Sequence, residues 1–351
     1  MRKYIPRAIS LILVLSALGI SAAVNSGEEP PRLPREPVYP GQAPADVSDT
    51  VLDARDLVMQ RRYDEAERLL WKLTRSRPDD PTGPTALMVV LQIRMLENEE
   101  NFLDAEMRRV IAINRSALEK FRQKAPRNAW YYTLVGASQG VEGIYHLWRD
   151  EYVPAGVRGY ASIQSMKKAL KVEPLNWEAR LGLGVYMYYR SIYASKAPFL
   201  PDSMDRSKEG LREIELAGKK RLYLYETSRI ALCRIHMDGK RWAEARKISD
   251  ELIAQYPHFL IFYLFSARAT FRAGNFRRAL TYYEKAYRID PSLPFAPYRM
   301  GVCNEKPGNL AEAARWFKIA AEAGAKRNPD KWGTKAQSRL EMLKAGNSQN
   351  P

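Results

Sequence analysis

The chain has 351 residues, of which 46% are apolar and 27% are charged, and these proportions provide a core and exclude a chain too polar to fold. Its net charge of +16 could attract nucleic acid, anionic lipid or an acidic polymer through a field that is independent of sequence. Because Lys and Arg are spread among Glu and Asp without a solid basic block, the charge indicates solvated helix faces with a basic bias in preference to a dedicated anion-binding surface.

Residues 1–23 are expected to be a secretory signal peptide. A basic start precedes an uncharged apolar run over 8–20, and small residues follow at 21–23. We expect cleavage after Ala23, because the apolar run is shorter than the roughly 20 residues of a spanning helix; an uncleaved anchor is the alternative and the one expected route to membrane contact. Cleavage removes three basic and no acidic residues, which lowers the net charge from +16 to +13. An exported location, periplasmic or in the cell envelope, makes nucleic acid an unexpected partner.

Residues 24–47 are expected to form a disordered linker, because they hold six prolines and few large apolar side chains. Residues 48–126 are expected to form N-terminal helical repeats. Their first helix pair spans 49–78, and the second spans 85–97 and 102–123, where apolar residues recur at helical spacing.

Residues 127–225 are expected to form irregular helix pairs. Asn128 is a plausible N-cap for a helix that runs to Trp148. Gly136, Gly140 and Gly143 follow at one-turn spacing, and a helical glycine costs about 1 kcal/mol relative to alanine, so we predict that a neighbouring helix comes close there. A later helix begins near Trp177, and an insertion over 194–204 then interrupts the pattern.

One pattern recurs three times over 226–325 with a period of 34 residues. It consists of two columns of small residues, a large apolar column between them, and two further columns that complete each second helix. The columns are Cys233, Ala267 and Gly301; Trp242, Phe276 and Leu310; Ala245, Ala279 and Ala313; Ser249, Tyr283 and Phe317; and Leu252, Ala286 and Ala320. Residues 326–351 are expected to add a capping helix and a tail.

This pattern resembles the tetratricopeptide repeat family, a 34-residue helix-turn-helix with small residues where its helices touch. The resemblance implies an all-α fold, a right-handed helical-repeat solenoid of about six units of which the earlier ones are irregular. It implies a binding scaffold as the function. Cys233 and Cys303 would lie in first helices two units apart, beyond the roughly 7 Å limit of a disulfide, so both are expected to be free and buried.

The resemblance also implies a concave groove lined by the first helix of each unit, with the second, fifth, ninth and twelfth positions facing the ligand. Those positions predict a partner-binding set: Arg234, Met237, Leu264, Arg268, Phe271, Phe295 and Tyr298. Arg234 and Arg268 occupy one column and are expected to lie close together, where two guanidinium groups suit a carboxylate or an acidic peptide. The alternative is that both arginines pair with carboxylates of adjacent helices.

A second candidate is an aromatic cluster whose members gather near helix ends: Tyr131, Tyr132, Tyr145, Trp148, Tyr186, Tyr188, Tyr189 and Tyr193. Packing between helices is the expected role of most of them, because aromatic stripes at helical spacing fill such space. Tyr189 and Tyr193 are added to the predicted partner-binding set, since tyrosine can grip a peptide or stack on a sugar.

Catalytic motifs are poorly represented. His146, His236 and His258 are the three histidines and none has metal-ligand spacing. Glu142 and His146 lie one turn apart, where an ordinary hydrogen bond is a better interpretation than a catalytic dyad. We therefore expect no enzyme activity, no cofactor and no metal, although an enzyme built around 128–204 remains a third hypothesis. The main prediction is a scaffold of the bacterial cell envelope that binds a protein or peptide. The alternative is a module that binds an anionic cell-wall or lipid polymer.

Overall fold

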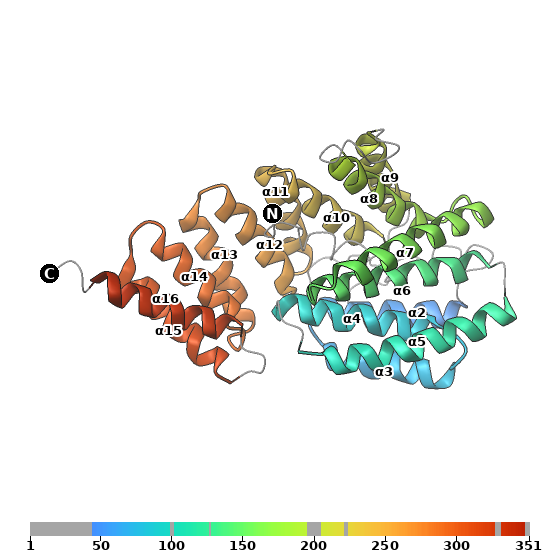
Figure 1. Cartoon of the computed structure of the whole chain (residues 1–351), viewed down its shortest axis with the longest axis horizontal. Helices are drawn as coiled ribbons and strands as arrows, with labels where there is room; N and C mark the ends of the chain where they lie inside the picture. The colour runs from blue at the N-terminus through green and yellow to red at the C-terminus, as the bar shows by residue number, and fades with distance from the viewer. Residues whose placement is uncertain are drawn as a thin grey trace. The chain divides into compact units, whose positions relative to one another are not determined.

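The computed structural model describes residues 44–98, 102–125, 128–194, 205–220, 224–326 and 331–347. All fifteen elements of these residues are α-helices, α2 to α16, which confirms the expected all-α helical-repeat fold (Figure 1). In chain order α2 to α15 make seven helix pairs, close to the six units expected. The predicted signal peptide, nearly all of the predicted linker and the insertion from residue 195 onward lie outside the described residues. No described helix is long and apolar enough to span a bilayer.

The chain divides into two compact units. The N-terminal unit comprises residues 1–93 and 103–234, and the C-terminal unit comprises 94–102 and 235–351. The first six helices are α2 (Ala45–Met59), α3 (Tyr63–Ser76), α4 (Thr82–Asn98), α5 (Asp104–Lys124), α6 (Ala129–Trp148) and α7 (Tyr152–Val172). The next four are α8 (Trp177–Ala194), α9 (Ser207–Lys220), α10 (Tyr225–Asp238) and α11 (Trp242–Gln255). The last five are α12 (Leu260–Arg272), α13 (Phe276–Ile289), α14 (Phe295–Glu305), α15 (Leu310–Gly324) and α16 (Trp332–Asn347). The finer domain boundaries drawn from the sequence stay a prediction.

The same backbone turn joins the two helices of five pairs. Its residue with positive φ is Arg61, Asp150, Lys240, Gly274 or Gly308. The residue that follows it donates its backbone N–H to the carbonyl oxygen of the residue five positions before it. Examples are the bonds from Asn275 to Thr270 (3.1 Å) and from Asn309 to Asn304 (3.0 Å). This is the 6→1 bond of a Schellman cap, which satisfies a carbonyl at the end of the first helix. The same turn therefore also links α2 to α3 and α6 to α7, outside the three regular copies.

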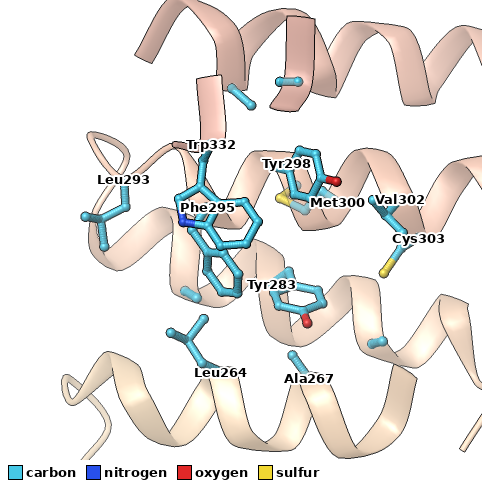
Figure 2. Packing of buried hydrophobic residues seen from close by; sticks show 14 of the residues in the cluster. Leu264, Ala267, Tyr283, Leu293, Phe295, Tyr298, Met300, Val302, Cys303 and Trp332 are labelled. Atoms are coloured by element: carbon cyan, nitrogen blue, oxygen red, sulfur yellow. The ribbon is translucent and has the colours of Figure 1, made fainter. Parts of the chain in front are cut away.

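Small residues let the paired helices of the C-terminal unit touch. Ala267, Ala279 and Ala313 are fully buried in one core cluster with Tyr283 and Phe317. Figure 2 shows Ala267 and Tyr283 of this cluster. A Cβ on Gly301 would lie 2.6 Å from the ring of Phe317, so this column accepts nothing larger than glycine where its partner is phenylalanine.

Close helix contact is also confirmed in the N-terminal unit. A Cβ on Gly136 would lie 2.8 Å from the Met166 methyl group, and one on Gly143 would lie 3.3 Å from the Ala155 carbonyl oxygen. Both contacts join α6 to α7, as the glycine spacing predicted. The predicted N-cap is confirmed as well, because Asn128 Oδ1 accepts from the backbone N–H groups of Trp130 and Tyr131 at 2.7 and 3.2 Å.

A buried polar triad joins three helices of this unit. The Thr85 hydroxyl on α4 donates to Asn114 Oδ1 on α5 at 3.0 Å, and Asn114 Nδ2 donates to the Ser138 hydroxyl on α6 at 2.6 Å. Buried polar groups of this kind require their partners, so the triad fixes the register of the three helices more strictly than apolar packing would.

Two glycine positions test the close-contact rule within the N-terminal unit. A Cβ on Gly210 of α9 would press on the Gly184 carbonyl oxygen of α8 and lie 2.8 Å from the Tyr188 backbone nitrogen. Because that backbone has no room to move, Gly210→Ala should destabilise the unit by about 1–3 kcal/mol. Gly156→Ala on α7, where a Cβ meets nothing within 4 Å, is the control and should stabilise by up to about 1 kcal/mol. Urea unfolding of both variants measures this; equal effects would contradict the close-contact rule.

The two cysteines are free and buried, as expected. Burial raises the pKa of the Cys303 thiol to about 12, whereas an unfolded thiol has a pKa of about 8.5. Folded protein at pH 8 should therefore react with a thiol-specific reagent only as fast as it opens, while unfolding in urea should expose both thiols. The raised pKa also contributes stability that is complete below pH ~8.5 and is lost as the pH rises toward 12. Rapid labelling of folded protein would contradict the buried position.

Candidate functional site

Three of the predicted groove residues belong to the core of the C-terminal unit. Leu264 is 4% exposed, Phe295 is 2% exposed and Tyr298 is 9% exposed. Figure 2 shows Trp332 of α16 beside Phe295 and Tyr298, with ring centroids 4.8 and 5.2 Å apart respectively. This corrects their assignment to a partner-facing surface. For Phe295 and Tyr298 the reason is that α16 packs on α14 and α15 and their large rings fill the space between these helices. Leu264 packs within the same core cluster.

Two more predicted residues need the same correction. Met237 and Tyr189 are buried, and the Tyr189 ring contacts Tyr188 edge to face at 5.4 Å. The side chain of Tyr193 lies outside the described part of the structure. In this cluster the expected packing role therefore holds for Tyr188 and Tyr189.

Three predicted groove residues remain partly exposed: Arg234, Arg268 and Phe271. Phe271 packs against the core cluster of the C-terminal unit and contacts Phe276 at 5.2 Å between ring centroids. Arg234 ends the N-terminal unit and Arg268 belongs to the C-terminal unit, so their proximity stays a prediction. Exposed Arg272 follows on α12.

Three basic side chains surround the Trp332 ring, and they belong to Arg299, Lys331 and Lys335. The Arg299 guanidinium carbon lies 5.3 Å from the Trp332 ring centroid, and the Nζ atoms of Lys331 and Lys335 both lie 4.5 Å from it. Cation–π attraction holds three positive charges near one buried ring. The result is a local concentration of positive charge at the start of α16, which we call the Trp332 cluster. The sequence reasoning missed it, although Lys331-Trp332 and Lys335 one turn later were a visible signal.

Two carboxylates where α5, α6 and α7 meet, Glu142 and Glu151, are engaged in ion pairs. Glu142 accepts from Arg115 on α5 at 2.5 Å and pairs with Arg158 on α7 at 3.0 Å. His146 contacts Glu151 at 2.6 Å through Nδ1. In the described structure Glu142 and His146 thus have other partners and do not form the dyad that was considered. These pairs tie α5, α6 and α7 together.

The same corner of the fold holds two groups with shifted pKa values, Glu151 and Tyr145. The hydrogen bond from His146, followed by that from Arg149, holds the pKa of Glu151 below its usual range. Burial, together with the hydrogen bond to Asp104, raises the pKa of Tyr145 to about 12. Arg149 also pairs with Asp104. Every shift thus keeps its group in the ordinary charge state at neutral pH, as in a structural network and unlike a general acid or base.

A carboxylate in the C-terminal unit has a similar role. Asp250 Oδ1 accepts from the hydroxyls of Ser266 and Tyr282, both at 2.7 Å, and these side chains come from α11, α12 and α13. Burial, together with this bond, raises the pKa of Tyr282. Among the described residues, no group of three or more His, Cys, Asp or Glu side chains is arranged to hold a metal ion.

The structure adds a surface that the sequence reasoning missed. On α7, Val153 is 78% exposed, Val157 is 62% exposed and Tyr160 is 68% exposed. The sequence signal was their spacing of four and three residues, which places all three side chains on one face of a helix. Ile163, Met166 and Ala169 of the same helix are buried.

The protein-family model described as Tetratricopeptide repeat matches residues 230–294 of this chain. No curated protein matches the chain. Three of the solved structures to which the chain is similar, all at low identity, follow. A tetratricopeptide repeat protein from Parabacteroides merdae ATCC 43184 is 15% identical with a TM-score of 0.40, over 85% of this chain and 98% of that one.

The TPR2AB domain of yeast Sti1, solved in complex with pHSP90, is 16% identical with a TM-score of 0.30, over 86% of this chain and 99% of that one. Yeast Tom70 is 14% identical with a TM-score of 0.42, over 96% of this chain and 70% of that one. The matched segment carries the 34-residue columns and the recurrent capped turn that also mark its flanking repeats. Residues 230–294 therefore carry tetratricopeptide repeats.

Proposed function

We propose that the protein is a non-enzymatic scaffold of the bacterial cell envelope that binds a peptide or protein through the first helices of its repeats. The observation that carries the proposal is the exposure pattern of α12. Of its residues, only Arg268, Phe271 and Arg272 are not buried. Arginine and aromatic side chains are the types that dominate binding energy at protein interfaces. A guanidinium group also pairs with a carboxylate through two parallel hydrogen bonds.

This exposure pattern favours an acidic partner. Arg268 and Phe271 lie one turn apart on α12, so one face combines a positive charge with an apolar ring. The predicted signal peptide supports the envelope location, because an exported scaffold would meet its partner outside the cytoplasm. Arg234 occupies the same repeat column as Arg268 and is the equivalent position of the preceding repeat.

Charge reversal tests this face. The double variant Arg234→Glu with Arg268→Glu should weaken capture of the partner at least tenfold, because each substitution puts like charges opposite each other. The measurement is crosslinking in cells from a photoreactive amino acid at Arg272, followed by identification and quantification of the crosslinked partner.

The matched control is Arg277→Glu with Arg288→Glu, which makes the same charge change at exposed positions of α13. It should leave the crosslinked product unchanged. Equal loss in the control would show a general charge effect, and unchanged capture by the first double variant would overturn the assigned face. Circular dichroism of each variant confirms that it is folded.

The Trp332 cluster favours the second candidate function, which is binding of an anionic cell-wall or lipid polymer. Three cations within 5.3 Å of one ring give a dense positive charge that would attract repeated anionic groups. The cluster lies in the C-terminal unit on α14 and α16, whereas the proposed peptide face centres on α12. The two candidates therefore use different residues and are separable by mutation.

Long-chain polyphosphate is a suitable probe for this second candidate. Lys331→Gln with Lys335→Gln should raise its dissociation constant several-fold at low salt, and the difference should shrink near 0.5 M salt because screening shortens the range of the charges. The control is Lys318→Gln with Lys326→Gln, two exposed positions of the same unit. If the control weakens binding equally, net charge explains the attraction and the cluster has no specific role.

A further inference from the structure

We propose that one face of α7 is a second docking surface, and that it receives a segment of another protein that is apolar in one half and acidic in the other. The face, called the α7 outer face, comprises Val153, Gly156, Val157, Tyr160, Gln164, Lys167 and Lys171. It lies in the N-terminal unit, away in sequence from the first-helix residues of the proposed peptide face, and does not depend on that proposal.

The first half of the α7 outer face is apolar and open. Val153, Val157 and Tyr160 are each more than 60% exposed. At 100° per residue, the three Cβ directions fall within about 60° of one another, so the side chains form one stripe. Single exposed apolar residues are normal on protein surfaces, but a continuous stripe indicates an interaction site.

The second half of the same line is basic. Gln164, Lys167 and Lys171 continue the stripe by one turn each, and both lysines are exposed. Lys168 stands beside them, with its Nζ atom 5.9 Å from the Tyr132 ring centroid. The helix has 21 residues, which corresponds to about 31 Å at 1.5 Å per residue. A complementary partner therefore places apolar side chains on the first half and carboxylates on the second.

Gly156 supplies a further observation on this face. It is exposed within the apolar stripe, and a Cβ there would meet nothing within 4 Å. Glycine is unfavourable inside a helix, and at Gly136 or Gly143 the contact with α7 explains it. No internal contact explains Gly156. Its missing side chain lowers the surface between Val153 and Tyr160, which would let a partner approach the helix closely.

Two other occupants fit this pattern less well. A helix that lies on a membrane carries apolar residues along its whole lipid-facing side, with lysines at the flanks, whereas Lys167 and Lys171 lie on the apolar line itself. A second copy of α7 would place lysines on valines if antiparallel, and lysines on lysines if parallel. Charge complementarity therefore selects an acidic protein segment.

The test uses the purified protein and a synthetic helical peptide labelled for fluorescence anisotropy. The peptide carries leucines at positions i, i+4 and i+7 of one half and glutamates on the same face of the other half. A peptide of equal composition with these residues scattered is the reference. The ordered peptide should bind at least tenfold more tightly than the scattered one, and equal binding or no binding of the ordered peptide would overturn the proposal.

Variants then locate the contact. Val157→Asp with Tyr160→Asp should weaken ordered-peptide binding at least tenfold, while Met342→Asp, an equally exposed apolar position on α16, should have no effect. Lys167→Glu with Lys171→Glu should weaken binding, and a peptide with lysines in place of glutamates should restore it. Failure of this charge exchange would overturn the basic half of the face.

Three further outcomes distinguish the alternatives. Co-sedimentation with phosphatidylglycerol vesicles that is lost in Val157→Asp would replace the protein partner with a membrane. A dimer in sedimentation velocity that is lost in the same variant would replace it with a second copy. Arg234→Glu with Arg268→Glu should leave peptide binding to the α7 outer face intact. The α7 proposal can therefore fail while the proposed first-helix surface stands, and the first-helix surface can fail while the α7 proposal stands.

Discussion

The fold depends on how closely the two helices of each pair can approach. Small residues such as Ala267 and Ala279 bring the helix backbones together, and the facing aromatic ring fills the remaining space. A turn with positive φ then reverses the chain within a few residues. Three of these turns use Arg61, Asp150 or Lys240, for which the left-handed conformation costs roughly 1 kcal/mol, whereas Gly274 and Gly308 avoid that cost. Pairing geometry therefore outweighs local backbone preference.

This close packing decides which side chains remain available for binding. In the C-terminal unit, α12 is packed so fully that only Arg268, Phe271 and Arg272 lie outside the core. Phe295 and Tyr298 serve as core because Trp332 lies against them. A repeat position that is predicted to face a ligand can thus be a packing position instead, depending on the size of its side chain and on the residues of the next helix.

The N-terminal unit solves the same packing problem with different chemistry. Glycines on α6 admit α7, while the Thr85, Asn114 and Ser138 triad and the ion pairs of Glu142 hold the helices in register. These polar contacts are directional, so α6 and α7 are fixed more rigidly than apolar contacts alone would require. A rigid α7 is a suitable support for an exposed binding stripe, because its face needs no ordering when a partner arrives.

The 34-residue columns and the Asn128 cap were readable from the sequence because they depend on local spacing and on side-chain size. The free state of Cys233 and Cys303 followed from the same register. Tertiary structure alone decided that Leu264, Phe295 and Tyr298 are core and that the Val153 and Val157 stripe is open. Burial depends on which helix covers a face, and an apolar stripe has the same periodicity whether or not another helix packs against it.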